Sequence, residues 1–249
     1  MSKMTNTNEI NHGTETLEVI SDAGKFNRWM YETIKPYCKG KVLEVGSGIG
    51  NISDFFLNDG FQISLSDLSN EYFKILESKF GKFPNLNELF CLDFAEPKLE
   101  EKYPGLIGQF DTVFALNVLE HVPDHEQAIR NCKLLLKPGG NLVILVPAFQ
   151  CLFNQFDVAL EHQRRYTPKT LNGVMCIPGF RLLHTQYFNV IGILGWFVSG
   201  KILRKKTIPE GQMKLYDTLV PLWKLVDWVI GRIMGLSVIS VVTKDEGLS

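Results

Sequence analysis

The chain has 249 residues, a formal net charge of −1 and 45% hydrophobic residues. This length and composition predict one large core with an elaboration, because two independent domains would each be small. The near-neutral charge lacks the basic excess typical of nucleic-acid-binding proteins, so we expect no nucleic-acid partner. The five cysteines are widely spaced without a Cys-x-x-Cys pair or a clustered His/Cys set, which indicates reduced thiols in a cytoplasmic protein.

The first twenty residues are polar and show no apolar period. We therefore expect a flexible N-terminal arm at 1–20 and a single domain over 21–249. The arm also lacks the apolar segment of a signal peptide. No apolar run reaches the roughly 18 to 20 residues that a membrane-spanning helix needs.

A glycine-rich turn after the first predicted strand is the strongest sign of a ligand site. Residues 41–45 form a short apolar run, and three alternate glycines follow at 46–50. The pattern predicts a buried strand that turns tightly into a helix and leaves backbone amides free for a ligand. A dinucleotide fingerprint would place its third glycine at Asn51. Glu44 would repel a pyrophosphate and attract an ammonium group, so we expect a ligand other than NAD.

The remaining elements alternate between strands and helices. After a helix at 22–37, we expect further strands at 61–65, 88–92, 110–116, 141–146, 180–188 and 236–243. Helices are expected between the earlier strands, at 53–58, 70–80 and 124–136. Strands separated by helices specify the α/β class, with a mostly parallel, doubly wound sheet.

Polar residues occupy the predicted carboxyl ends of the strands, where doubly wound sheets bind ligands. Glu44, Asp67, Asp93 and Asn117 stand at four such ends. Asp67 follows the glycine turn at about the twenty-residue spacing from which a carboxylate reaches ribose hydroxyl groups. It could instead only cap the next helix. Asp93 could accept a hydrogen bond from an exocyclic amine while Phe94 packs on a base.

The order of these motifs resembles that of the class I S-adenosylmethionine-dependent methyltransferases. The resemblance spans about residues 26–147 and rests on the segments 42–51, 65–67, 91–94, 110–122 and 135–140. It implies a Rossmann-like, doubly wound sheet of seven strands, mostly parallel, with an antiparallel last strand. It also implies that S-adenosylmethionine is the cofactor and is held by Glu44, Gly46, Ser47, Gly48, Gly50, Asn51, Asp67, Leu68, Asp93, Phe94 and Asn117.

Residues 148–175 are expected to form a lid on the acceptor side. Two adjacent arginines in this segment suit bidentate binding of a carboxylate or phosphate. The stretch resembles a His-x-Arg-Arg-Tyr element of a methyltransferase subgroup from bacterial glycan and lipid-linked sugar pathways. A solvated arginine pair beside a tyrosine packed on the core is the alternative. We expect the acceptor to contact Trp29, His162, Arg164, Arg165 and Tyr166.

His121 and His162 are the candidate catalytic bases. A hydroxyl that attacks a sulfonium methyl must lose its proton, and an imidazole with a pKa near 6.5 can accept it. In-line placement of the acceptor can supply much of the rate, so a base helps without being obligatory. Related quinone-pathway O-methyltransferases use acidic residues and a histidine here for a divalent ion. Asn117 stands where a further acid would help, so we expect no metal.

Nearly fifty residues separate the last two predicted strands, which indicates a helical insertion at 189–236. An apolar patch at 191–197 precedes the basic residues Lys201, Arg204, Lys205 and Lys206, and an amphipathic helix at 214–234 is interrupted by Pro221. These features suit an anionic membrane surface or a pocket for a long apolar acceptor. A helical cover packed on the sheet is the alternative.

These features together predict an S-adenosylmethionine-dependent methyltransferase. We expect it to methylate an oxygen of a small or lipid-linked acceptor, bearing a glycan or carboxylate, by in-line SN2 transfer; the choice of oxygen rests on analogy. One alternative is a quinone-pathway O-methyltransferase acting on a polyprenylated phenol. Another is a non-catalytic, cofactor-binding partner of a membrane glycosyltransferase. We expect a cytoplasmic location, with peripheral contact at the inner membrane face through 189–234.

Overall fold

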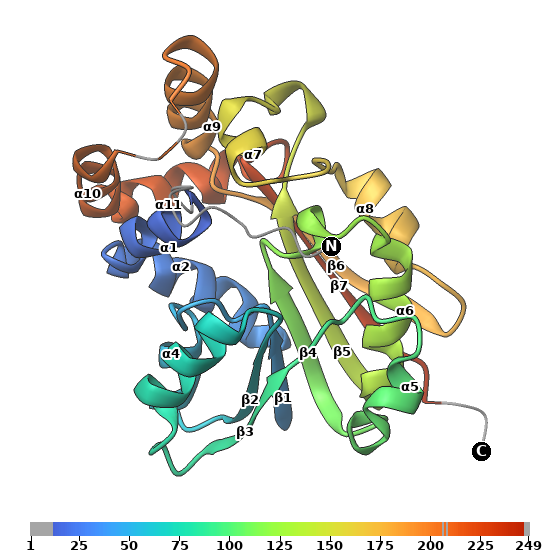
Figure 1. The fold of residues 1–249 in the computed structure, drawn as a ribbon. Coiled ribbons are helices and arrows are strands. Elements are labelled where there is room, and N and C mark those ends of the chain that lie inside the picture. The colour runs from blue at the N-terminus through green and yellow to red at the C-terminus, as the bar shows by residue number, and fades with distance from the viewer. Residues whose placement is uncertain (1–11, 206, 208, 247–249) are drawn as a thin grey trace, which may run out of the picture.

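The computed structural model describes residues 12–205, 207 and 209–246 (Figure 1). Within these residues, seven strands form one sheet in the order β3-β2-β1-β4-β5-β7-β6. The strands are β1 (Lys41–Val45), β2 (Gln62–Asp67), β3 (Leu86–Cys91), β4 (Phe110–Leu116), β5 (Leu136–Pro147), β6 (Phe180–Phe188) and β7 (Ser237–Lys244). β1 to β5 pair in parallel, whereas β7 runs antiparallel to both β5 and β6. The predicted α/β, Rossmann-like, doubly wound sheet with an antiparallel last strand is confirmed.

Helices cover both faces of the sheet (Figure 1). They are α1 (His12–Ser21), α2 (Gly24–Ile34), α3 (Ser53–Asn58), α4 (Asn70–Phe80), α5 (Leu99–Lys102), α6 (His125–Leu135), α7 (Gln155–Ala159), α8 (Pro168–Met175), α9 (Gly192–Trp196), α10 (Glu210–Thr218) and α11 (Val220–Ile230). One core lies beneath α6 and α8, and the other lies beneath α2, α3 and α4. Leu43 and Val113 point into the first core, and Val42 and Phe114 into the second. Because both faces are covered, the central strands are apolar throughout.

Of the segment expected to be a flexible arm, residues 12–20 lie within α1, and residues 1–11 lie outside the described residues. The helix lies against the glycine turn, contacts α2 and α10, and packs Val19 against the second core. The side-chain amide of Asn51 donates to the carbonyl oxygen of Leu17 at 3.1 Å, and Leu17 lies against Gly48. The hydroxyls of Thr14 and Tyr72 are 2.9 Å apart.

The insertion before β7 forms α9, a π-helical turn (Phe197–Ile202), α10 and α11. The interruption expected at Pro221 separates two helices: α10 ends at Thr218, and Pro221 occupies the first turn of α11. Both α10 and α11 contact α2, so the insertion packs on a helix at the end of the sheet. No helix among the described residues combines the length and apolar composition that a membrane crossing requires.

Candidate functional site

A cavity of about 900 Å³ opens at the carboxyl ends of β1, β2 and β4, toward the top of Figure 1. Ligand pockets are usually about 300–1,000 Å³, so this one is large. The predicted cofactor residues that line it are Glu44, Gly46, Ser47, Gly48, Asn51, Asp67, Leu68, Asp93, Phe94 and Asn117. His121, His162 and Arg165 line the same cavity, which therefore brings the expected donor and acceptor residues together.

The glycine turn is held in a shape that other residues adopt with strain. Gly46 and Gly48 have φ angles of +70° and +54°. A Cβ at Gly46 would collide with Val118. The amide of Gly48 donates to a carboxylate oxygen of Asp67 at 2.9 Å. The turn is thus fixed from its neighbouring strand and presents a concave backbone to the cavity.

Glu44 places a fully buried carboxylate beneath this turn. The hydroxyl of Ser53 donates to it, and burial raises its pKa to about 8, against the lowering effect of Ser53 and Ser47. A carboxylate with a pKa raised by burial gains strongly from a cationic partner. The site is therefore suited to an ammonium group of a ligand.

Asp67 and Asp93 each bind a nearby backbone amide and still face the cavity. Asp67 accepts from Ser69 at 2.9 Å as well as from Gly48, and burial raises its pKa. Asp93 accepts from the amide of Ala95 at 2.9 Å. The predicted alternative, that Asp67 only caps the next helix, is incomplete, because the cap of α4 is the side chain of Ser69.

Among the predicted site residues, Gly50 and Trp29 lie away from the cavity lining and pack within the fold. Gly50 has a φ of +80°, and a Cβ there would collide with the ring of Phe80, so this glycine allows close packing of α4. Trp29 is buried against Phe188, with ring centroids 4.5 Å apart. Both residues support the fold around the site.

Glu120, His121 and His162 form a cluster in the cavity lining, where we expect the acceptor. Glu120 and His121 belong to a short turn after β4 (Leu119–His121), and His162 follows α7. His162 Nε2 is 4.0 Å from Glu120 Oε1, and the two imidazole rings meet edge to face. Burial raises the pKa of Glu120 to about 8. Burial, and then the neighbouring His162, lower the pKa of His121 to about 4.

Asp157 orients two of the predicted residues. Its Oδ1 lies 2.8 Å from both His162 Nδ1 and Arg165 Nε. Although burial acts in the opposite direction, these two partners hold the pKa of Asp157 below its ordinary value. Arg165 also donates to the carbonyl of Ala148 at 3.0 Å and stacks over the ring of Trp196. Its guanidinium group is thus committed to the protein.

Arg164 and Tyr166 lie outside the cavity lining. The guanidinium of Arg164 donates to the carbonyls of Val122 and Pro123 at 2.8 and 3.0 Å. The hydroxyl of Tyr166, a residue that is 2% exposed, is 2.7 Å from His125 Nδ1. These contacts fix the segment after α7 to the residues that follow β4, and they thereby help to hold His162 in place.

The cavity lining also contains the apolar residues Phe156, Leu160, Trp196 and Met213. The indole nitrogen of Trp196 is buried without a hydrogen-bond partner among the described residues. Sequence reasoning missed Asp157, Glu120 and Trp196 as site residues. Glu120 lies within the 110–122 motif. The roles of Asp157 and Trp196, in contrast, depend on contacts between segments that are distant in the sequence.

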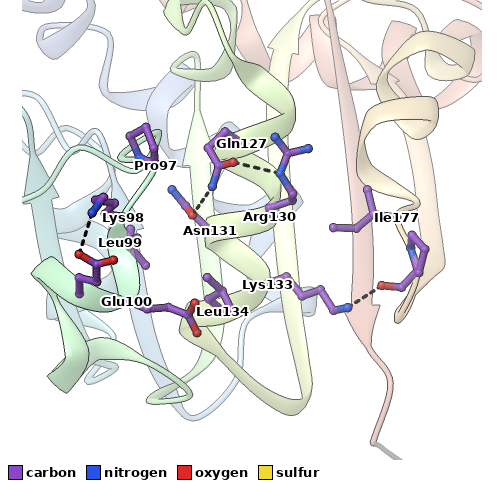
Figure 2. A pocket seen from close by; sticks show the side chains of 12 residues that line it. Pro97, Lys98, Leu99, Glu100, Gln127, Arg130, Asn131, Lys133, Leu134 and Ile177 are labelled. Carbon is purple, nitrogen blue, oxygen red and sulfur yellow. Dashed lines mark hydrogen bonds and ion pairs between the residues drawn. The ribbon is translucent and has the colours of Figure 1, made fainter.

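A second hollow, of about 590 Å³, lies along α6 between α5 and the loop after α8 (Figure 2). Its charged groups are engaged locally: Lys98 pairs with Glu101, and Lys133 donates to the carbonyl of Pro178. Its described lining contains no residue of the predicted site. The candidate functional site is therefore the larger cavity.

Residues 43–142 match a family model described as a methyltransferase domain. The chain is similar to the ubiquinone biosynthesis O-methyltransferase of Xanthomonas euvesicatoria pv. vesicatoria (strain 85-10), with 36% identity over 130 residues. That match covers 52% of this chain and 52% of that protein. The chain thus spans about half the length of the curated relatives it matches.

Solved structures share the fold at lower identity. A SAM-dependent methyltransferase from Archaeoglobus fulgidus has a TM-score of 0.57 and 16% identity, covering 88% of this chain and 94% of that chain. Phosphoethanolamine N-methyltransferase 2 of Haemonchus contortus, in complex with S-adenosylmethionine, has a TM-score of 0.58 and 18% identity. It covers 88% of this chain and 52% of that chain.

Proposed function

We propose, from the premise that the chain carries a class I S-adenosylmethionine-dependent methyltransferase domain, that it methylates an oxygen of a small or lipid-linked acceptor. One observation carries the proposal. A single cavity joins the residues expected to hold the cofactor to the cluster of Glu120, His121 and His162. A donor at one end and an acceptor at the other would meet inside it, which is the arrangement that in-line transfer needs.

The residues around the glycine turn fit this cofactor. Glu44 offers a buried carboxylate to its ammonium group, and Gly46 and Gly48 line the cavity where the methionyl chain would lie. Asp67 would bind the ribose hydroxyls, and Phe94 would pack on the adenine. When bound, the cofactor supplies a methyl group activated by a sulfonium centre. The chain's own task is to place the acceptor oxygen in line with that methyl group.

A hydroxyl acceptor must also lose its proton at the acceptor end. Of the two predicted bases, His162 is better suited, because Asp157 fixes its Nδ1 and leaves Nε2 on the side of Glu120. The pKa of His121, lowered to about 4, makes it a poor proton acceptor at neutral pH. In-line placement supplies the rest of the rate enhancement.

The walls of the acceptor end favour an acceptor with an apolar body. Arg164 and Arg165 suggested binding of a carboxylate or phosphate, but their guanidinium groups are bonded to the protein itself. Phe156, Trp196 and Met213 line this end instead. We therefore favour a lipid-linked molecule over a small carboxylate-bearing one as the acceptor.

A polyprenylated phenol of a quinone pathway is the second candidate acceptor. The specific observation in its favour is the 36% identity to a ubiquinone biosynthesis O-methyltransferase, over half of each chain. A phenol would present its hydroxyl to the cluster at Glu120 while its prenyl chain lay along the apolar wall. A lipid-linked glycan would use the same wall for its lipid.

The test is cofactor turnover with a panel of polyprenylated phenols, lipid-linked glycans and small carboxylic acids. We expect S-adenosylhomocysteine and a product heavier by one methyl group with at least one lipid-linked acceptor. Asp67→Ala is the control, in which weaker cofactor binding should reduce turnover. Cofactor binding without turnover of any acceptor would contradict methyl transfer and favour the non-catalytic partner of a glycosyltransferase.

We further propose a peripheral membrane contact through residues 189–234. α11 leaves Leu222, Leu225 and Trp228 exposed, the last at 79%. Lysines and arginines are exposed along the same insertion: Lys201, Arg204, Lys205, Lys214, Lys224 and Arg232. Asp217 and Asp227 turn inward and accept hydrogen bonds from backbone amides. An apolar face with basic neighbours suits an anionic bilayer, which for a cytoplasmic protein is the inner membrane face.

Flotation with vesicles tests this contact. The chain should float with anionic phosphatidylglycerol vesicles more than with phosphatidylcholine vesicles, and high salt should weaken the difference. Trp228→Glu combined with Leu225→Glu should abolish flotation. Leu182→Glu, at an exposed position on β6, is the matched control and should float like the wild type. Equal flotation of both variants would contradict the proposal.

A further inference from the structure

The insertion before β7 supplies one wall of the large cavity. Its lining residues recur at helical spacing on two segments: Gly192, Gly195, Trp196 and Ser199 on α9 and the π-helical turn, and Pro209, Gln212, Met213 and Tyr216 at α10. Each segment therefore turns one face toward the cavity. The hydroxyl of Ser199 donates to Gln212 Oε1 at 2.8 Å and joins the two segments.

Gln212 marks a place where this wall reaches the surface. It is an exposed residue of the cavity lining, whereas Ser199 and Met213 are buried. On the outer side, Leu194 of α9 and Leu215 of α10 are exposed at 65% and 63% and lie outside the lining. Apolar side chains therefore stand on both the inner and the outer side of the wall.

Gly195 leaves space in the wall at this place. Among the described residues, a Cβ at Gly195 would meet only Nε2 of Gln212, at 3.2 Å, which is the end of a flexible side chain. A Cβ at Gly192 or Gly200 would instead collide with a neighbouring asparagine, so these two glycines are needed for packing. A glycine inside a helix lowers the stability of the helix. Since tight packing does not require Gly195, room for a ligand is the reason that remains for it.

The backbone next to Gly195 is also unusual. α9 continues into the π-helical turn at Phe197–Ile202, where the amide of Leu203 donates to the carbonyl of Val198 at 2.9 Å. π-helical turns are rare and occur frequently at functional sites. Ser199, which holds Gln212, lies within this turn. The unusual backbone is therefore part of the contact between the two segments.

We propose that an apolar chain of the acceptor passes between α9 and α10 over Gly195, and that Gly195 determines which acceptors the cavity admits. This inference rests on the proposed function and names its substrate class. The reactive oxygen would lie in the cavity, while a linear apolar chain would extend past Gly195 toward Leu194 and Leu215. Gln212 is exposed, so its side chain can turn toward water and leave the passage free.

The experiment compares two probes, a phenol that carries a farnesyl chain and the same phenol with a methyl group in its place. Calorimetry uses the full-length chain saturated with S-adenosylhomocysteine. The wild type should bind the farnesyl phenol at least about 10-fold more tightly than the methyl phenol, because only the longer chain fills the passage. Gly195→Leu should weaken binding of the farnesyl phenol at least about 10-fold and change binding of the methyl phenol less than about twofold.

Two further variants and a control distinguish a blocked passage from a general disturbance. Gly195→Ala adds only one methyl group and should give a smaller loss in the same direction. Gln212→Ala clears the space over Gly195 and should bind the farnesyl phenol at least as tightly as the wild type. Gly211→Leu, in the first turn of α10 with no described atom within 4 Å of its Cβ position, is the matched control. It should bind both phenols like the wild type.

Cofactor affinity and the thermal transition of each variant show whether it has folded. Gly195→Ala should raise the transition temperature, because alanine favours a helix more than glycine does. A wild type that binds both phenols equally, or neither, would overturn the inference, as would equal losses in Gly195→Leu and Gly211→Leu. Methyl transfer that does not depend on residue 195 would leave the proposed function standing, whereas selective binding of the farnesyl phenol without methyl transfer to any acceptor would leave only the passage.

Discussion

Glu44 shows how one side chain can be costly to the fold and useful to a ligand. Its pKa is raised to about 8 by burial, whereas in an unfolded chain it would be near 4.3. The folded state therefore binds more protons than the unfolded state between these values. Stability falls as pH rises through this window, by up to about 1.4 kcal/mol per pH unit for one such group.

Glu44→Gln should accordingly stabilise the free protein above pH 8, with a difference that shrinks toward pH 5. It should also weaken cofactor binding roughly 10- to 100-fold, since a hydrogen bond to a charged group is worth about 1.5–3 kcal/mol. Wild-type cofactor affinity should rise as the pH increases toward 8 and the Glu44 carboxyl ionises, whereas that of the variant should stay flat over this range. Urea unfolding and calorimetry measure the two effects. A variant that is less stable at every pH would refute the account of Glu44.

Gly60 is a matched control for substitution of Gly50, the last glycine of the glycine turn. Both have φ near +80°, but a Cβ at Gly50 would collide with Phe80, whereas Gly60 has open space around it. Gly60→Ala should cost about 1–2 kcal/mol of unfolding free energy, the usual penalty for this backbone conformation. Gly50→Ala should cost clearly more, because Phe80 is buried in the core. Equal losses in urea unfolding would show that Phe80 can move aside.

α1 is the element whose role differs most from expectation. It lines the cavity through Thr16, Leu17 and Ile20 and lies against the glycine turn. Leu17→Asp should therefore weaken cofactor affinity more than global stability, because Leu17 lines the cavity and belongs to neither main core. Glu18→Gln, at an exposed position on the same helix, is the control. Calorimetry with S-adenosylmethionine would contradict this role if both variants bound like the wild type.

The segment from α7 to Tyr166 depends on the buried pair of Asp157 and Arg165. Asp157→Asn leaves a buried guanidinium without its counter-charge, and such losses typically cost 3–5 kcal/mol. Glu101→Gln removes the partner of Lys98 in an exposed pair and should cost less than about 1 kcal/mol. Urea unfolding of the two variants measures the contrast. A small loss in Asp157→Asn would mean that water or another group replaces the carboxylate.

At the scale of the whole molecule, periodic patterns predicted the sheet well. Apolar runs bounded by turns marked each strand, and four polar strand ends met in one cavity as expected. Such patterns could not predict the contacts between segments that are distant in the sequence. Arg164 and Arg165 looked alike in sequence, yet one binds carbonyls on the outside and the other is buried against Asp157. Only the packing of α7 against the turn after β4 decides this difference.

The position of β7 has a consequence for synthesis. β7 lies between β5 and β6, although it follows both of them in the chain. Until the ribosome has delivered residues 237–244, β5 and β6 each present an open edge, and open edges invite pairing with other chains. The insertion at 189–236 emerges during this interval with its apolar face exposed. We therefore expect a nascent chain of this protein to require protection from aggregation, by a chaperone or a membrane, until β7 has been synthesised and pairs with β5 and β6.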